Sequence, residues 1–340
     1  MARLRMCATR AEIISFGENN LKRLQKQGLL KNGVPSQSTL CRIDQTLDAE
    51  GLAESMEKFI GKHLRKFEEL KIIAIDGKCT RGTVLENGKN PDIVSAFSVD
   101  EKLTISTVMC EEKSNEIPAA ERLIDKLDLD GCVVTADAMF CQKSIIDKIT
   151  GKDGHFLIEV KSNQKSLRWS IEDNLDKIEP LHTFKGEVSL EHGRIESREC
   201  RTYDAGEAKV DMVKWDRALT VIDIRTSSEN KKDGSETQMR RIYISDLRLK
   251  ADRLNETSKK HWGIESFHWS LDTCQKQDSI RRKTAKAARN LDTIQRMCLS
   301  IVSIWKGKRK KLKDRASGFK KITRECSNNL NFLFDVMSLK

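Results

Sequence analysis

Two aspartates stand at the ends of apolar segments that have the composition of buried strands. Asp76 ends the segment IIAID, and Asp137 ends the segment CVVTAD. A carboxylate in such a place gains nothing from its apolar neighbours, so it has to be solvated, paired or bound to a metal ion. Because the carboxyl ends of neighbouring strands commonly lie along one edge of a sheet, we expect the two side chains to share a site. The alternative for Asp76 is that it begins a turn with Gly77.

A third carboxylate, Glu265, lies in the predicted helix KKHWGIESFHWSLD. His261, Glu265 and His268 are spaced i, i+4 and i+7, so they share one face of this helix. This polar stripe could bind a metal ion, or it could be a surface face of a helix that docks into the core through Trp262 and Trp269. A zinc hydrolase site would need the order H-E-x-x-H, which is absent. The histidines are therefore expected to have structural roles or to contact the residues that bind a metal ion, and not to bind the metal themselves.

The periodicity of apolar residues predicts the elements that position these carboxylates. Residues 1–70 read as helical, and whether they bind DNA or only pack stays open. Residues 71–162 read as βββαβαβ, which predicts an α/β fold with a mixed sheet flanked by helices. Residues 163–250 contain a helix and then strand-like segments with a polar loop, SSENKKDGSE, and are interpreted as an insertion. Helices return over residues 251–305, and residues 306–340 form a basic linker and tail.

Composition limits the class of partner. The chain of 340 residues has 62 lysines and arginines against 51 acids, a formal net charge of +11. This balance favours polyanions such as nucleic acid, although solubility alone would also explain it. No apolar run approaches the roughly 20 residues of a membrane span, and the N-terminus lacks the apolar segment of a signal peptide. We therefore expect no membrane partner and a cytosolic location.

The ten cysteines include no CxxC pair, and several fall within apolar stretches. A structural zinc site would need closely spaced thiolates or imidazoles, which these spacings do not supply. The cysteines are therefore expected to be reduced and mostly buried.

Five basic residues are candidates for contacts with DNA phosphates. Lys78 follows Asp76, and Lys161 ends the predicted strand HFLIEVK. The other three form a dense patch after the helix that carries Glu265, and they are Arg281, Arg282 and Lys283. Cationic side chains of this kind bind the sugar-phosphate backbone without reading sequence. The alternative for all five is an ordinary solvated charge.

Six motifs occur in an order that gives the chain a family resemblance. They are AIDGK with a following RG, TADAM-x-CQ, VKSNQ, HGRIE, HWGIE-x-x-HW-x-LD and ARNLDTIQRM-x-L. With the PSQST-x-x-R segment near the N-terminus, they make the chain similar to the H repeat-associated insertion-sequence transposases, from about Val34 to Ile304. This resemblance implies a ribonuclease H-like core in which Asp76, Asp137 and Glu265 are the three catalytic carboxylates.

The resemblance also implies a chemistry and its partners. Hard carboxylate oxygens suit two Mg²⁺ or Mn²⁺ ions, which promote cleavage of double-stranded DNA at the element ends and strand transfer into target DNA. A dimer on the DNA and a location in the bacterial cytosol, with the nucleoid, are expected. Two other interpretations stay open. One is an inactive or truncated relic that only binds DNA, and the other is a metal nuclease that cuts without joining.

Several positions depart from the family pattern. The resemblance implies a longer helical segment before Pro35 than the 34 residues found here. Phe140 stands where the family tends to have glycine, and Gln277 beside Asp278 stands where an acid often follows the catalytic helix. None of these departures removes a proposed metal ligand.

Overall fold

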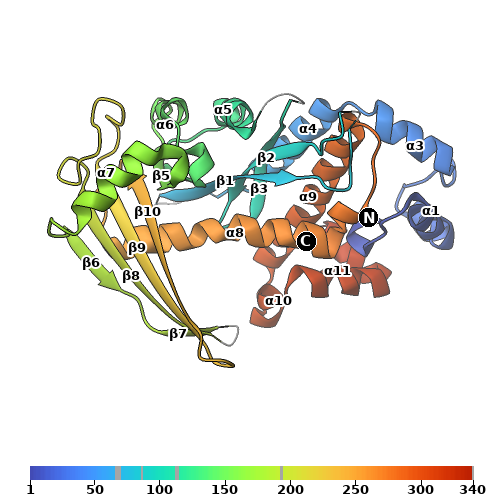
Figure 1. Ribbon diagram of the computed structural model, residues 1–340. Coiled ribbons are helices and arrows are strands. Elements are labelled where there is room, and N and C mark those ends of the chain that lie inside the picture. Colours follow the sequence, from blue (N-terminus) through green and yellow to red (C-terminus); the bar gives the residue numbers. More distant parts are fainter. Residues whose placement is uncertain (66–69, 86, 112–114, 192–193, 339–340) are drawn as a thin grey trace. The chain divides into compact units, whose positions relative to one another are not determined.

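The chain forms two compact units (Figure 1). The computed structural model describes residues 1–65, 70–85, 87–111, 115–191 and 194–338. The first unit consists of Met1–Lys66, Gly77–Ala119 and Ile264–Lys340, and the second of Phe67–Asp76 and Ala120–Gly263. Three elements belong to both units, and they are β1 (Lys71–Cys79), α5 (Glu116–Lys126) and α8 (Ala251–Gln275).

Three parallel strands organise the second unit. They are β1, β4 (Cys132–Ala136) and β5 (His155–Val160), with β4 between the other two. All five residues of β4 are buried, as expected of a central strand whose two faces are both covered. The helix α6 (Lys143–Thr150) packs against β5 through an apolar face that includes Ile145 and Ile149.

The inserted β-rich region extends this same sheet. Its strands are β6 (His182–Lys185), β7 (Ser189–Glu191), β8 (Arg194–Asp204), β9 (Thr220–Asn230) and β10 (Glu236–Ser245). They pair antiparallel, and β10 pairs with β5 through registers such as Ile242 opposite Val160. The insertion therefore continues the core sheet. Before it comes α7 (Lys165–Leu175), as the sequence predicts a helix there.

The polar loop expected at SSENKKDGSE is much shorter in the structure. β9 runs to Asn230 and β10 begins at Glu236, with Glu229 opposite Glu236. Backbone hydrogen bonding between two paired strands does not require apolar side chains, so polar residues continue the ribbon where both of its faces meet solvent. The first two residues of the HGRIE motif, 192–193, lie outside the described residues.

In the first unit, helices pack on an antiparallel pair, β2 (Asp92–Ser98) and β3 (Leu103–Met109). α4 (Ala49–Gly61) and α9 (Ala285–Lys308) both contact β3. The remaining N-terminal helices are α1 (Arg10–Asn19), α2 (Leu21–Lys26) and α3 (Gln37–Thr46). α1 begins with a capping box in which the Thr9 hydroxyl accepts from the Glu12 backbone N–H and the Glu12 carboxylate accepts from that of Thr9.

The end of the chain is folded against its beginning. The C-terminal residues form α10 (Leu312–Ala316), α11 (Phe319–Asn328) and α12 (Leu330–Ser338). Leu4 is buried in one apolar cluster with Trp305 of α9, Cys326 of α11 and Leu333 of α12. The hydrophobic contribution of this cluster ties the two ends of the chain together.

The expected architecture is confirmed. The strand order β3-β2-β1-β4-β5 follows the predicted βββαβαβ succession, and the sheet is mixed because parallel and antiparallel pairs occur in it. A helical N-terminal region and an inserted β-rich region are present, as expected. None of the helices in the described part of the chain combines the length and apolar character needed to cross a bilayer.

The cysteines are all unpaired thiols, six of them buried. Burial raises the pKa of the Cys141 and Cys200 thiols to about 12, so almost no thiolate is present at neutral pH. We expect iodoacetamide at pH 8 to alkylate the native chain only among the four half-buried cysteines, and all ten cysteines after unfolding. Among the four, Cys79 should react slowly, because burial raises the pKa of its thiol to about 11. Mass spectrometry of the labelled chain measures this. Rapid native labelling of Cys141 would contradict the burial.

Candidate active site

The pairing of β1 with β4 brings Asp76 and Asp137 together. The last parallel pair is Ile75 opposite Ala136, so the next residue on each side is an aspartate. Because side chains alternate along a strand, both aspartates point to the same face of the sheet. β1 continues to Cys79, so Asp76 lies within the strand, and the alternative of a turn at Gly77 is wrong. Asp137 directly follows β4, and its side chain is 46% exposed.

His261 of α8 covers this face beside Asp137. Its Nδ1 lies 3.0 Å from the Oγ1 of Thr135, which precedes Asp137 by two residues and therefore points the same way. Its Nε2 is 4.0 Å from Asp137 Oδ1 and makes no hydrogen bond to a described residue. Burial lowers the pKa of His261, and this outweighs the opposing influence of the Asp137 and Asp76 carboxylates. The imidazole is therefore neutral at neutral pH.

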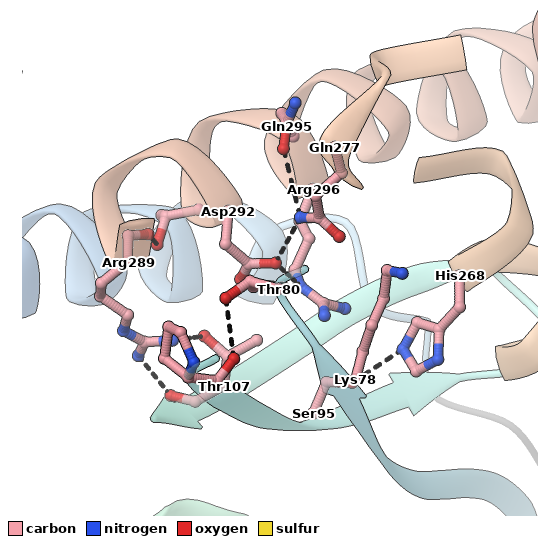
Figure 2. Close-up of polar contacts among 12 residues, drawn as sticks. Lys78, Thr80, Ser95, Thr107, His268, Gln277, Arg289, Asp292, Gln295 and Arg296 are labelled. Carbon is pink, nitrogen blue, oxygen red and sulfur yellow. Dashed lines mark hydrogen bonds and ion pairs between the residues drawn. The ribbon is translucent and has the colours of Figure 1, made fainter. Parts of the chain in front are cut away.

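In the first unit, the same face of α8 is held by two further contacts. His268 Nε2 lies 3.3 Å from the Ser95 hydroxyl on β2 (Figure 2). One turn later, Asp272 accepts from Lys78 Nζ at 2.9 Å, and Lys78 is two residues after Asp76 on β1. Glu265 occupies this face between the two histidines, as an exposed residue of α8. Both histidines thus have structural contacts, as the sequence predicts.

One part of the alternative interpretation of this helix, the docking of Trp262 and Trp269 into the core, is wrong. Trp262 is 37% exposed and Trp269 is 64% exposed, so neither docks into the core. The guanidinium of Arg241 lies over the Trp262 ring, 4.3 Å from its centroid. The buried side of α8 is instead formed by residues such as Ile264, Phe267 and Leu271.

Comparison with known proteins decides the family. Residues 69–301, more than half of the chain, match the transposase DDE domain family. This chain belongs to the DDE transposases. The ribonuclease H-like core that the sequence predicts is confirmed by this match together with the mixed sheet.

Two similar proteins are named as putative transposases. The transposase is 31% identical to the putative transposase YncI of Escherichia coli O157:H7, over 96% of this chain and 84% of that protein. It is 28% identical to the H repeat-associated putative transposase YhhI of Escherichia coli strain K12, over 96% of this chain and 87% of that protein. Among solved structures it is similar to piggyBac transposase in a synaptic complex with hairpin DNA, at a TM-score of 0.46 and 11% identity, over 89% of this chain and 59% of that chain.

The basic residues singled out from the sequence differ in how they are placed in the transposase. The Lys78 side chain is only 10% exposed and lies between Asp272 and Asp278, so its charge is already neutralised. Arg282 is 7% exposed and lies 3.5 Å from Asp44. Lys161 is 49% exposed and pairs with Glu159 at 2.9 Å. The remaining two, Arg281 and Lys283, are exposed.

Sequence reasoning missed a fourth carboxylate beside the two aspartates. Glu159 lies on β5, and the pairing of Leu157 with Thr135 puts it on the face that carries Asp137. It is only 4% exposed and influences the pKa of His261. Its signal in the sequence was a lone acid inside the apolar run HFLIEV, where a charge needs a partner, and that partner is Lys161.

The donor atoms of the transposase site fit a hard divalent cation. Carboxylate oxygens are the ligands that Mg²⁺ prefers, and Asp76 and Asp137 provide them on adjacent strands. Because the His261 ring is neutral, it supplies no positive charge to these carboxylates. No three His, Cys, Asp or Glu side chains in the described part of the chain are already grouped to hold a metal.

The structure explains why the RG motif of the transposase has a glycine, Gly82, at its second position. A Cβ on Gly82 would lie 2.5 Å from the Ile280 carbonyl oxygen, which is backbone and cannot rotate away. We expect Gly82→Ala to lower the free energy of unfolding by about 1 to 3 kcal/mol through overpacking. Denaturant titration measures this. Gly61→Ala is the matched control, because nothing lies within 4 Å of its added Cβ. Equal effects of the two substitutions would contradict the contact.

Proposed function

We propose that this transposase cleaves DNA at the ends of its element and joins the cut ends to target DNA by metal-dependent phosphoryl transfer. Asp76, Asp137 and Glu265 would hold two Mg²⁺ or Mn²⁺ ions. The observation that carries the proposal is the register of β1 and β4, which places the two aspartates side by side. Glu265 is the proposed third ligand because it shares a face of α8 with His261, one turn earlier, which contacts Thr135 and lies beside Asp137.

The bound ions would neutralise charge on the phosphate and favour the hydroxide form of an attacking water. In the first step, a water oxygen forms a bond to phosphorus and the bond to the 3′ oxygen breaks, leaving a 3′ hydroxyl. In the second step, that hydroxyl attacks a target phosphodiester, whose own P–O bond breaks. No covalent bond to the protein is needed, so the side chains contribute position and charge.

The chain's own residues would keep this geometry. Thr135 holds the His261 ring through Nδ1, so that Nε2 faces Asp137. The neutral ring fills the space beside the carboxylate without competing for its charge. The ion pair between Lys78 and Asp272 holds α8 near β1. Glu265 lies about two turns before Asp272 on the same helix, so this ion pair would help to fix its position.

The partner would be double-stranded DNA, with element ends and target bound by a dimer. The formal net charge of +11 favours it, and the exposed Arg281 and Lys283 together with Lys161 are the proposed phosphate contacts. A location in the bacterial cytosol, on the nucleoid, follows from this partner.

Incubation of the full chain with end-labelled DNA carrying the element ends, plus an unlabelled target duplex, tests the proposal. With Mg²⁺ or Mn²⁺ we expect cut ends and joined products, and with EDTA neither. Free ends without joined products would indicate a nuclease. DNA binding without any cutting would indicate a DNA-binding relic, and either outcome overturns the proposal.

A further inference from the structure

A pocket lies in the second unit, on the inserted strands. It has a volume of about 650 Å³. Ten of its lining residues come from β6, β8, β9 and β10, and Lys185, Arg225 and Arg240 are among them. The long antiparallel strands that carry them are labelled in Figure 1.

Two arginines lie side by side in this pocket. Arg225 of β9 is directly opposite Arg240 of β10 in the strand register. Like charges directly opposite each other destabilise an antiparallel pair, so their juxtaposition needs compensation. Asp223 lies on the same face of β9, two residues before Arg225, and its side chain is fully buried. Without this carboxylate the two guanidinium groups would repel each other.

Asp223 binds both guanidinium groups and orients them. Its Oδ2 accepts from Arg225 Nε at 3.0 Å and from Arg240 Nη2 at 3.0 Å, and its Oδ1 accepts from Arg240 Nε at 2.8 Å. A fully buried carboxylate is costly unless it is paired, and here it is paired twice. Guanidinium groups carry five N–H donors each, so donors remain after these bonds. The arginines are 39% and 30% exposed, so those donors can reach a ligand.

The acids of the pocket leave room for an anion. Asp176 lies 3.3 Å from Arg225 Nη2, but its side chain is 72% exposed, and exposed pairs of this kind contribute little. Glu199 is already paired with Arg201 at 3.0 Å. A phosphate could therefore replace Asp176 at Arg225 and gain charge-assisted hydrogen bonds from two adjacent arginines.

The pocket opens on the opposite face of the sheet from the two aspartates. Arg240 shares a face with Ile242, which pairs with Val160 of β5. Glu159, the neighbour of Val160, points to the other face, which carries Asp137. An anion bound by Arg225 and Arg240 is therefore not the phosphate that lies at the aspartates.

We propose that Arg225 and Arg240, held by Asp223, bind a backbone phosphate of duplex DNA away from the cleaved bond, and that Asp176 occupies this site when DNA is absent. The inference rests on the proposed function, since it assumes that DNA is the partner. It adds to that function a specific phosphate site on the inserted strands.

Binding of a fluorescein-labelled duplex, measured by anisotropy in EDTA over a range of salt concentrations, tests the site. We expect the double variant Arg225→Gln, Arg240→Gln to weaken binding about tenfold at low salt and to reduce the salt slope by about one to two. Asp176→Asn should tighten binding about threefold, because it removes the competing carboxylate. This exposed substitution also keeps the test decisive if the double variant folds poorly.

Matched controls separate the site from general charge. Asp173→Asn makes the same charge change three residues earlier on α7. The double variant Arg217→Gln, Arg248→Gln removes two exposed arginines, as many charges as the pocket double variant removes. Effects of the pocket variants that do not exceed those of their controls would overturn the site. Binding without metal is independent of cleavage. Failure of the proposed chemistry would leave these affinity differences in place, whereas failure of this inference would leave cleavage by the wild type in place.

Discussion

Asp137→Asn is expected to reduce metal-dependent DNA cleavage at least about a thousandfold, a loss of roughly 4 kcal/mol of transition-state stabilisation. The amide keeps the size of the side chain but removes the negative charge that would hold a cation beside Asp76. Asp76→Asn and Glu265→Gln should have effects of the same order, because each would remove one ligand from a shared site. The rate of cutting of an end-labelled duplex under single-turnover conditions measures all three.

DNA affinity separates this loss from misfolding. Each variant should bind duplex DNA within about tenfold of the wild type, since phosphate contacts supply most of the affinity. Asp125→Asn is the control for charge, because Asp125 is an exposed residue that pairs with Lys148 at 2.6 Å. Cleavage by Asp137→Asn at the rate of this control would refute the proposed ligand. Cleavage that is lost only for Glu265→Gln would refute the shared site.

Asp292→Ala is expected to destabilise the first unit by about 3 to 5 kcal/mol. Asp292 and Arg296 are one turn apart on α9 and each is 1% exposed, with Arg296 Nε donating to both carboxylate oxygens at 2.9 Å (Figure 2). Gln277 Nε2 also donates to Asp292 Oδ1 at 2.9 Å. Removal of the carboxylate leaves a buried guanidinium without its counter-charge, which costs more than the lost hydrogen bonds.

Thermal and denaturant unfolding of the full chain measure this effect. The double variant Asp292→Leu, Arg296→Met should be more stable than Asp292→Ala, because it removes both buried charges together. Asp216→Ala breaks an exposed pair with Lys143 and should leave the melting temperature unchanged. A melting temperature of Asp292→Ala equal to that of Asp216→Ala would contradict a structural role for the buried pair.

The order of elements could be predicted from the sequence because it depends on local patterns. Apolar segments of strand length ended at Asp76 and Asp137, and the structure pairs those strands in parallel. The polar face of α8 could be predicted from helical spacing alone, since residues four apart share a face in any helix. The full length of β9 and β10 could not be predicted. Their paired ends have polar side chains without a strand pattern, and the pairing is made by backbone hydrogen bonds.

The local sequence pattern could not predict which basic side chains are exposed. Lys78 and Arg281 look alike in the sequence, yet Lys78 lies between Asp272 and Asp278, while Arg281 is exposed. The partners of Lys78 come from nearly 200 residues further along the chain. A charge can be assigned to DNA or to an internal pair only when such distant partners are known.

The family, the strand succession and the three candidate carboxylates could be predicted from residue type, order and periodicity. Which side chains meet depends on how distant segments pack in the folded chain. Strand register and helix packing place Glu159 and His261 beside Asp137. Strand register also places Arg225 opposite Arg240, next to Asp223. Register is a relation between distant segments, and the free energy that selects it comes from burial and pairing across the whole fold.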